Sequence, residues 1–225
     1  MSEPRVNDEP APLRRRAESA AAAGVVYSIL AVVALVTVQS VPPASSTEAV
    51  WNEWIGEASN RAGLVVALSL ASISAVAFLW FVAVVRRRIG DREDRFFATV
   101  FLGSALVHVA LWLVVMSILA APAMINTEDM PLEWDVFRLA EGTAIGILLV
   151  AAPRIQAVFV ASTSTMFLRT RVVPTWLSYV GYVLAVVMFI VPIVTTPVGL
   201  GLPAFVLVAS VTILFTRRRI EHDST

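Results

Sequence analysis

An arginine, Arg154, lies inside an otherwise apolar run that reads LLVAAPRIQAVFV (residues 148–160). Its guanidinium stays charged and offers a planar fork of hydrogen-bond donors that matches the oxygens of carboxylates and phosphates. Gln156 follows two residues later, and His108 lies within another apolar run. Such side chains can bind an anion or join helices through hydrogen bonds. Which of these applies depends on the elements that carry them.

The composition of the chain indicates a membrane environment for these residues. Of its 225 residues, 58% are hydrophobic and only 15% are charged, which is too little polar surface for a soluble domain. Apolar runs recur along the chain, and about 20 apolar residues cross a bilayer core of about 30 Å. Backbone groups in lipid must be hydrogen-bonded within their own segment, so spans are helical. We therefore predict an all-α membrane protein.

The apolar runs predict a bundle of six transmembrane helices over residues 20–216. Their approximate limits are 20–39, 62–85, 96–121, 139–165, 174–195 and 198–216. Residues 1–19 are polar and contain proline, which favours a disordered cytoplasmic tail; residues 217–225 form a second tail. A signal peptide is the alternative for the N-terminus, although the following run exceeds an h-region of about 7–15 residues.

The arginines predict the orientation of these spans. Fourteen of the 17 fall in the N-terminal tail, in alternate loops and at the C-terminus, which is one side of the predicted membrane. Only Arg61 and Arg138 fall on the other side, and Arg154 is the remaining one. Since basic loops stay in the cytoplasm, we expect both termini to be cytoplasmic, in a bacterial plasma membrane.

Several function classes are disfavoured. A formal net charge of zero gives no basic face for nucleic acid. The absence of cysteine excludes disulfides, thiolate metal sites and a cysteine nucleophile. The sequence has no HExxH, P-loop or GxSxG motif and no paired aspartates within a span. We therefore predict no enzyme, no metal site and no cofactor.

The predicted cytoplasmic hairpin reads RRRIGDREDRFFATVF (residues 86–101). We expect Gly90 to end one helix and Asp91 to cap the next, with the arginines anchored at the anionic inner leaflet. Alternatively, four charged residues form a site for a cytoplasmic partner or a lipid headgroup. These are Arg92, Glu93, Asp94 and Arg95.

The predicted outer segments, residues 46–61 and 126–138, are acidic and contain tryptophan. Each is expected to form a short interfacial helix, with Ser46 or Thr47 and Asp129 as N-caps. The tryptophans suit the aromatic belt at the headgroup level. They are Trp51, Trp54 and Trp134.

Small residues recur at the spacing of close helix contacts. Gly142 and Gly146 do so in the predicted fourth span, and a similar row lines the second span. That row is Ala67, Ala71 and Ala75.

Two segments resemble a group of uncharacterised actinobacterial multi-span membrane proteins. They read FLWFVAVVRRRIGDREDRFFATVFLGS (residues 78–104) and STSTMFLRTRVVPTWLSYVGY (residues 162–182). In that group an arginine likewise precedes the second segment, and it corresponds to Arg154. This chain departs from the group at Pro153, and at Arg171, where a glycine is usual. The resemblance implies a polytopic membrane protein and brings no biochemical function.

The polar residues within the spans predict one buried polar site. Arg154 lies about 13 residues, or about 20 Å, from the inner end of its span, and His108 about 12 residues, or about 18 Å, from the inner end of its own. We expect Arg154 to face the bundle interior and to donate to carbonyls, Gln156, a serine or neutral His108, with Pro153 freeing the Leu149 carbonyl. The serines at this depth are Ser72 and Ser74.

Three interpretations of this site remain open: a polar knot that fixes helix packing, an anion or lipid-phosphate site, and an arginine that reaches towards the inner leaflet. Glu141, the one acid within a span, is expected to pair with Arg138. The favoured function is a non-enzymatic membrane component that binds lipid or a membrane protein. The alternative is a small transporter or channel for an anion or another small solute. The sequence leaves the oligomeric state open.

Overall fold

The computed structural model of the chain describes residues 11–43, 45–89, 95–125, 133–170, 173–190 and 199–222. The helices are α1 (Ala11–Val38), α2 (Glu48–Gly56), α3 (Ala58–Ile89), α4 (Arg95–Ile125), α5 (Trp134–Gly146), a π-helical turn η2 (Ile147–Ala151), α6 (Ala152–Thr170), α7 (Thr175–Ile190) and α8 (Gly201–His222). The described residues contain no strand, and they confirm the prediction of an all-α fold.

Four helices are long and apolar enough to cross a membrane: Ala21–Val38, Ala58–Arg86, Phe96–Ile125 and Trp134–Thr170. The last is one continuous helix made of α5, η2 and α6. Two shorter apolar helices, Thr175–Ile190 and Gly201–Phe215, follow. They match the last two predicted spans in position, while residues 191–198 between them lie outside the described part. Membrane-spanning helices are therefore supported for the first four predicted spans.

The predicted disordered tail differs from the structure, because α1 already begins at Ala11. The residues from Leu13 onward are mostly alanine, arginine, glutamate and leucine, which favour a helix, and Pro12 is tolerated in the first turn.

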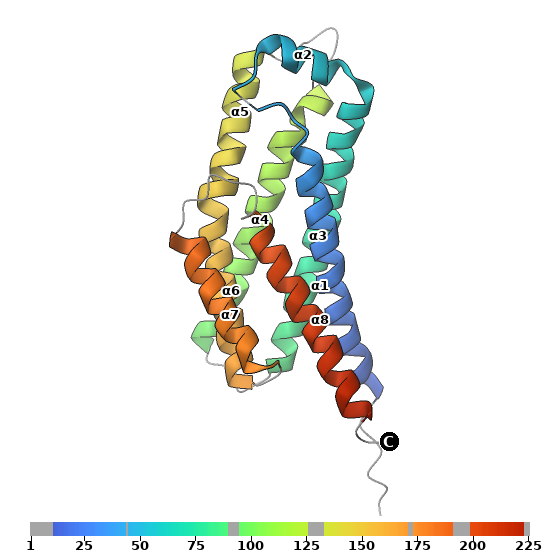
Figure 1. Cartoon of the computed structure of the whole chain (residues 1–225), viewed down its shortest axis with the longest axis vertical. Helices are drawn as coiled ribbons and strands as arrows, with labels where there is room; N and C mark the ends of the chain where they lie inside the picture. Colours follow the sequence, from blue (N-terminus) through green and yellow to red (C-terminus); the bar gives the residue numbers. More distant parts are fainter. Residues whose placement is uncertain are drawn as a thin grey trace, which may run out of the picture.

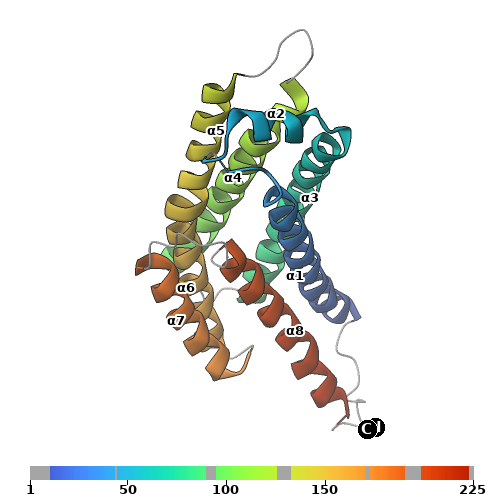
Figure 2. The same ribbon diagram turned by 45° about the horizontal axis from the view of Figure 1, so that its top comes forward.

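The helices form an up-and-down bundle. The main helix pairs are α1 with α3 and α8, α3 with α4, α4 with α6, and α6 with α7. Figures 1 and 2 show α3, α4 and α5 continuing to one end of the bundle, where α2 crosses it, whereas α7 and α8 stop well short of that end. We call this the α2 end. The opposite end, where Arg86 and Arg169 lie in the last turns of α3 and α6, is the arginine end.

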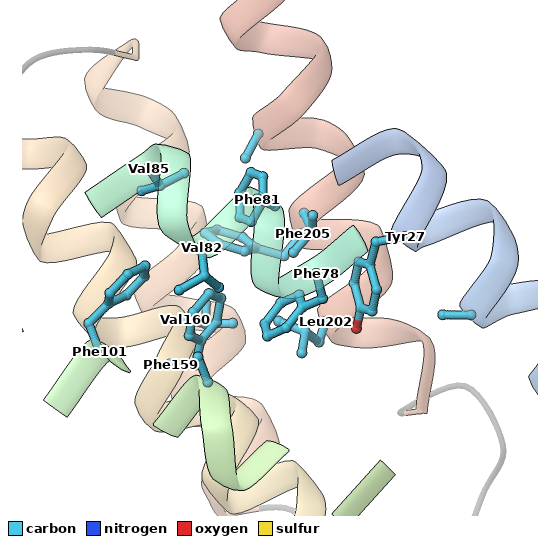
Figure 3. Close-up of a cluster of buried hydrophobic side chains, with 14 of the residues drawn as sticks. Tyr27, Phe78, Phe81, Val82, Val85, Phe101, Phe159, Val160, Leu202 and Phe205 are labelled. Carbon is cyan, nitrogen blue, oxygen red and sulfur yellow. The ribbon is translucent and has the colours of Figure 1, made fainter. Parts of the chain in front are cut away.

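Aromatic side chains fill the centre of the bundle (Figure 3). The ring centroids of Phe78 and Phe159 are 5.1 Å apart, as are those of Phe101 and Phe159. Lipid is as apolar as these side chains, so helices associate in a membrane through close packing rather than through the hydrophobic effect.

Glycines bring two helix pairs close together. A Cβ added at Gly24 would lie 2.0 Å from Ser210 Oγ, and one added at Gly181 would lie 2.0 Å from Ser164 Oγ. The prediction of close contact is wrong for Gly142 and Gly146, where an added Cβ would meet no atom of another described helix within 4 Å. It is confirmed for the alanine row, whose members are all buried: Ala67, Ala71 and Ala75.

At the α2 end, α2 lies across the bundle as a short helix capped by Thr47, whose side chain accepts from the Val50 N–H. This confirms the predicted helix and one of its two proposed caps. Asp129 and the other residues from 126 to 132 lie outside the described part, and the rest of the second outer segment belongs to the start of α5.

The belt prediction is wrong for Trp51, which is buried. Its ring stacks on Phe137 with centroids 3.6 Å apart, and Trp54 and Trp134 lie against it at 5.9 and 6.1 Å. The sequence shows that tryptophans lie near the ends of the spans, but not that α2 folds against the bundle and buries Trp51.

Candidate functional site

Three buried polar side chains from three helices meet at the centre of the bundle. Tyr27 Oη of α1 lies 3.3 Å from His108 Nε2 of α4. Gln156 Nε2 of α6 lies 3.3 Å from His108 Nδ1. All three are buried, and Phe78 packs edge-on against the imidazole with ring centroids 5.1 Å apart. We call this set the Tyr27–His108–Gln156 cluster.

Hydrogen-bond chemistry allows two arrangements of this cluster. A neutral imidazole has one donor and one acceptor nitrogen. If the Gln156 amide donates to Nδ1, then Nε2–H of His108 donates to Tyr27. If the amide is turned over, its oxygen accepts from Nδ1–H and the Tyr27 hydroxyl donates to Nε2. Among the described residues Gln156 Oε1 has no hydrogen-bond partner, so the first arrangement leaves this buried oxygen unpaired, at a cost of about 1–3 kcal/mol.

The structure brings two residues of the predicted polar site, His108 and Gln156, into contact and places Arg154 away from them. Arg154 is half-buried. Its Nη1 donates to the carbonyl of Val150, which is itself an exposed residue. Residues two positions apart on an α-helix point about 200° apart around its axis. Arg154 therefore faces away from the bundle, because Gln156 faces into it. The expected donation to a carbonyl is confirmed, but the acceptor is Val150 and not Leu149.

The turn before Arg154 is irregular. In η2 the Ala152 N–H donates to the Ile147 carbonyl, five residues back. Pro153 follows at once; it has no N–H, and in a regular α-helix its ring would press on the Leu149 carbonyl. A π-helical turn widens the backbone at such a point and relieves the clash.

Of the two predicted serines, one faces the interior, as Gln156 does, and the other faces outward, as Arg154 does. Ser74 is buried, and the Trp112 Nε1–H donates to its Oγ at 3.1 Å, which joins α3 to α4. Ser72 is exposed and donates to the Leu68 carbonyl at 2.9 Å. Ser72 therefore does not belong to a buried site.

The predicted cytoplasmic site lies mostly outside the described residues. This is true of Arg92, Glu93 and Asp94, while Arg95 is described only as the first residue of α4. Nearby, the guanidinium of Arg169 lies 4.8 Å from the ring centre of Phe97, a cation–π contact that joins α6 to α4 at the arginine end. Arg138, expected to pair with Glu141, has its Nη1 3.6 Å from Asp135 Oδ1.

Sequence reasoning did not single out Tyr27 or Trp112. Each is a lone polar-tipped aromatic in an apolar run, and such residues usually find a hydrogen-bond partner when buried. That rule could have identified both as candidates for a buried hydrogen bond, but it could not have predicted their partners.

Fold and site together define a helical membrane protein with a polar cluster at its centre and with Arg154 on the outer side of α6. No family model matches the chain, and no curated protein or solved structure matches it.

Proposed function

We propose that the protein is a non-enzymatic component of a bacterial plasma membrane that binds an anionic group of a lipid or of a membrane partner through the outer face of α5 and α6. One observation carries this proposal: Arg154 lies within an apolar helix, on its outer face. In this proposal the six apolar helices all span the membrane and both termini are cytoplasmic.

The energetics of an intramembrane arginine support this function. Arginines within membrane helices are rare because they are costly to insert, and they mark binding sites or pathways. Arginine has five N–H donors. Among the described residues the Val150 carbonyl is the one hydrogen-bond acceptor of Arg154. The other donors are available to a phosphate or carboxylate, which arginine binds in bidentate geometry.

The test compares what co-purifies with the protein. The wild type, Arg154→Lys and Arg154→Leu are extracted into native membrane discs, and bound lipids and proteins are identified by mass spectrometry. Arg138→Leu is the matched control, because Arg138 lies on the same continuous helix and is already paired with Asp135. We expect an anionic lipid or a specific protein to be lost with Arg154→Leu and kept in the control. Equal recovery from all four proteins would refute the proposal.

The second candidate function is transport of a small anion. The Tyr27–His108–Gln156 cluster favours it, because it places unpaired polarity at the centre of the bundle and close to the π-helical turn. The test is anion flux into liposomes that contain the pure protein. Transport requires a flux that falls with Gln156→Leu, and empty liposomes set the background.

A further inference from the structure

We infer that Arg154 binds the phosphodiester of a phospholipid in the leaflet nearer the α2 end, and that the apolar layer of the bilayer ends near Val150. This inference rests on the proposed function and names the ligand of the same site. In it, α2 and the adjoining parts of α3, α4 and α5 project beyond the apolar layer.

The arginine end fixes one boundary of the layer. Arg86 and Arg169 are exposed there. Large apolar side chains are exposed at this level at Phe96, Trp176 and Phe215, as they also are at the α2 end at Met124 and Leu139. The arginines, and not the apolar exposure, therefore set this boundary.

Helix ends mark the second boundary. α1 ends at Val38, which packs against the small apolar cluster that contacts Ile147 and Leu148 of η2 and also against the neighbouring Trp51 cluster. The chain enters α8 at a similar height, because a Cβ added at Gly199 would lie 3.6 Å from Leu35 of α1.

The end of α7 follows from its pairing with α6. Thr165 and Tyr182 share a hydrogen bond of 2.7 Å. Because the helices are antiparallel, Ile190 falls beside Ala157, about one turn from Arg154. Figures 1 and 2 show α3, α4 and α5 continuing past this level towards α2.

The distance between these boundaries matches a bilayer. Val150 is about 28 Å from Arg169 along the helix axis, against about 30 Å for a hydrocarbon core. Helical side chains lean towards the N-terminus, and the bond of Arg154 to the Val150 carbonyl brings its guanidinium to that height. The charged group thus reaches the edge of the apolar layer, where phospholipid phosphates begin.

The charges nearer the α2 end agree with this boundary. Arg138 and Asp135 have side chains that are 53% and 89% exposed, and they lie about 45 Å or more from Arg169 along the helix. A core of about 30 Å that begins at the arginine end leaves both in water. A phosphate is therefore the anion that every phospholipid offers at the height of Arg154, whereas a partner's carboxylate would have to be placed there specifically.

The first experiment measures depth. The chain has no cysteine, so single spin labels can be placed at Val107, Val150 and Leu139, all on exposed positions. Collision rates with oxygen and with a water-soluble nickel complex then report depth in phosphatidylglycerol–phosphatidylcholine liposomes. We expect position 107 near the bilayer centre, 150 at the headgroup boundary and 139 in water. A label at position 150 as deep as the one at 107 would overturn the inference.

The second experiment measures binding in a sugar detergent that has no phosphate. Thermal unfolding is followed with added phosphatidylglycerol, with an equal amount of a galactolipid and with inorganic phosphate. We expect phosphatidylglycerol to raise the Tm of the wild type by about 2–4 °C more than the galactolipid does. Arg154→Leu should abolish this difference, Arg154→Lys should keep part of it, and Arg138→Leu should keep all of it.

The alternative outcomes separate the inference from the proposed function. Equal stabilisation by galactolipid, or an equal effect of inorganic phosphate alone, overturns the lipid phosphodiester as ligand. If a protein partner depends on Arg154 while position 150 lies deep in the bilayer, the proposed function stands and this inference fails. If Arg154→Leu does not fold, the depth measurement, which leaves Arg154 in place, still decides.

Discussion

Replacing Gly24 with alanine should weaken the contact between α1 and α8. The added Cβ would lie 2.0 Å from Ser210 Oγ and 2.9 Å from Phe81 Cδ2. The serine hydroxyl can rotate away, but Phe81 is fully buried, so the helices must separate slightly. Overpacking of this kind costs about 1–3 kcal/mol, which corresponds to a fall in Tm of about 2–4 °C for each kcal/mol in a chain of this size.

The assay is thermal unfolding of the purified protein in detergent, with Gly142→Ala as the matched control. A Cβ at Gly142 meets nothing within 4 Å, and alanine is the better helix former by about 1 kcal/mol. The control should therefore be as stable as the wild type or slightly more so. Adding Ser210→Gly to Gly24→Ala should recover part of the loss. Equal Tm values for Gly24→Ala and Gly142→Ala would refute the close α1–α8 contact.

Three further predictions concern topology, the α2 end and the polar cluster. A cysteine at Ser59 should react with an impermeant thiol reagent in intact cells and one at Thr175 should not; the reverse pattern would invert the proposed orientation. Trp51→Ala should lower the free energy of unfolding by about 3–5 kcal/mol, and half-buried Trp54→Ala by clearly less, as measured by Tm; equal effects would contradict the stacked core. Tyr27→Phe should cost about 0.6–1.7 kcal/mol, the range for side-chain hydrogen bonds between membrane helices, and an unchanged Tm would show that its hydroxyl contributes nothing.

The sequence predicts the helices of this protein better than their faces. Apolar length is a local property, so the four long helices follow directly from it, and the position of α2 follows from Thr47 before an acidic first turn. Residues 191–198, where the predicted limits of the last two spans meet, lie outside the described part of the chain, and α8 continues to His222, beyond the predicted limit at 216.

The faces are harder to predict because lipid and protein interior are both apolar. A helix in a soluble protein shows its buried side by a polar opposite side. Here exposed residues such as Val183 and Ile190 are as apolar as buried ones. Polar residues then become the main indication of an interior face. That indication was correct for His108, Gln156 and Ser74, and wrong for Arg154 and Ser72.

The error at Arg154 has a geometric cause in η2. The buried face of α5 includes Phe137, Glu141 and Ala144. If this buried face continued along a regular α-helix at about 3.6 residues per turn, position 155 would lie at its centre and Arg154 at its edge. The π-helical turn contains one extra residue, so the buried face shifts by one position along the chain. The buried residues of α6 then include Ala152, Gln156, Phe159, Thr163 and Phe167. Arg154 then lies about 160° around the helix from Gln156, on the outer side. Since Pro153 disfavours a regular turn at this point, the same irregularity that places Gln156 beside His108 also turns the arginine outward, where an anionic ligand can reach it.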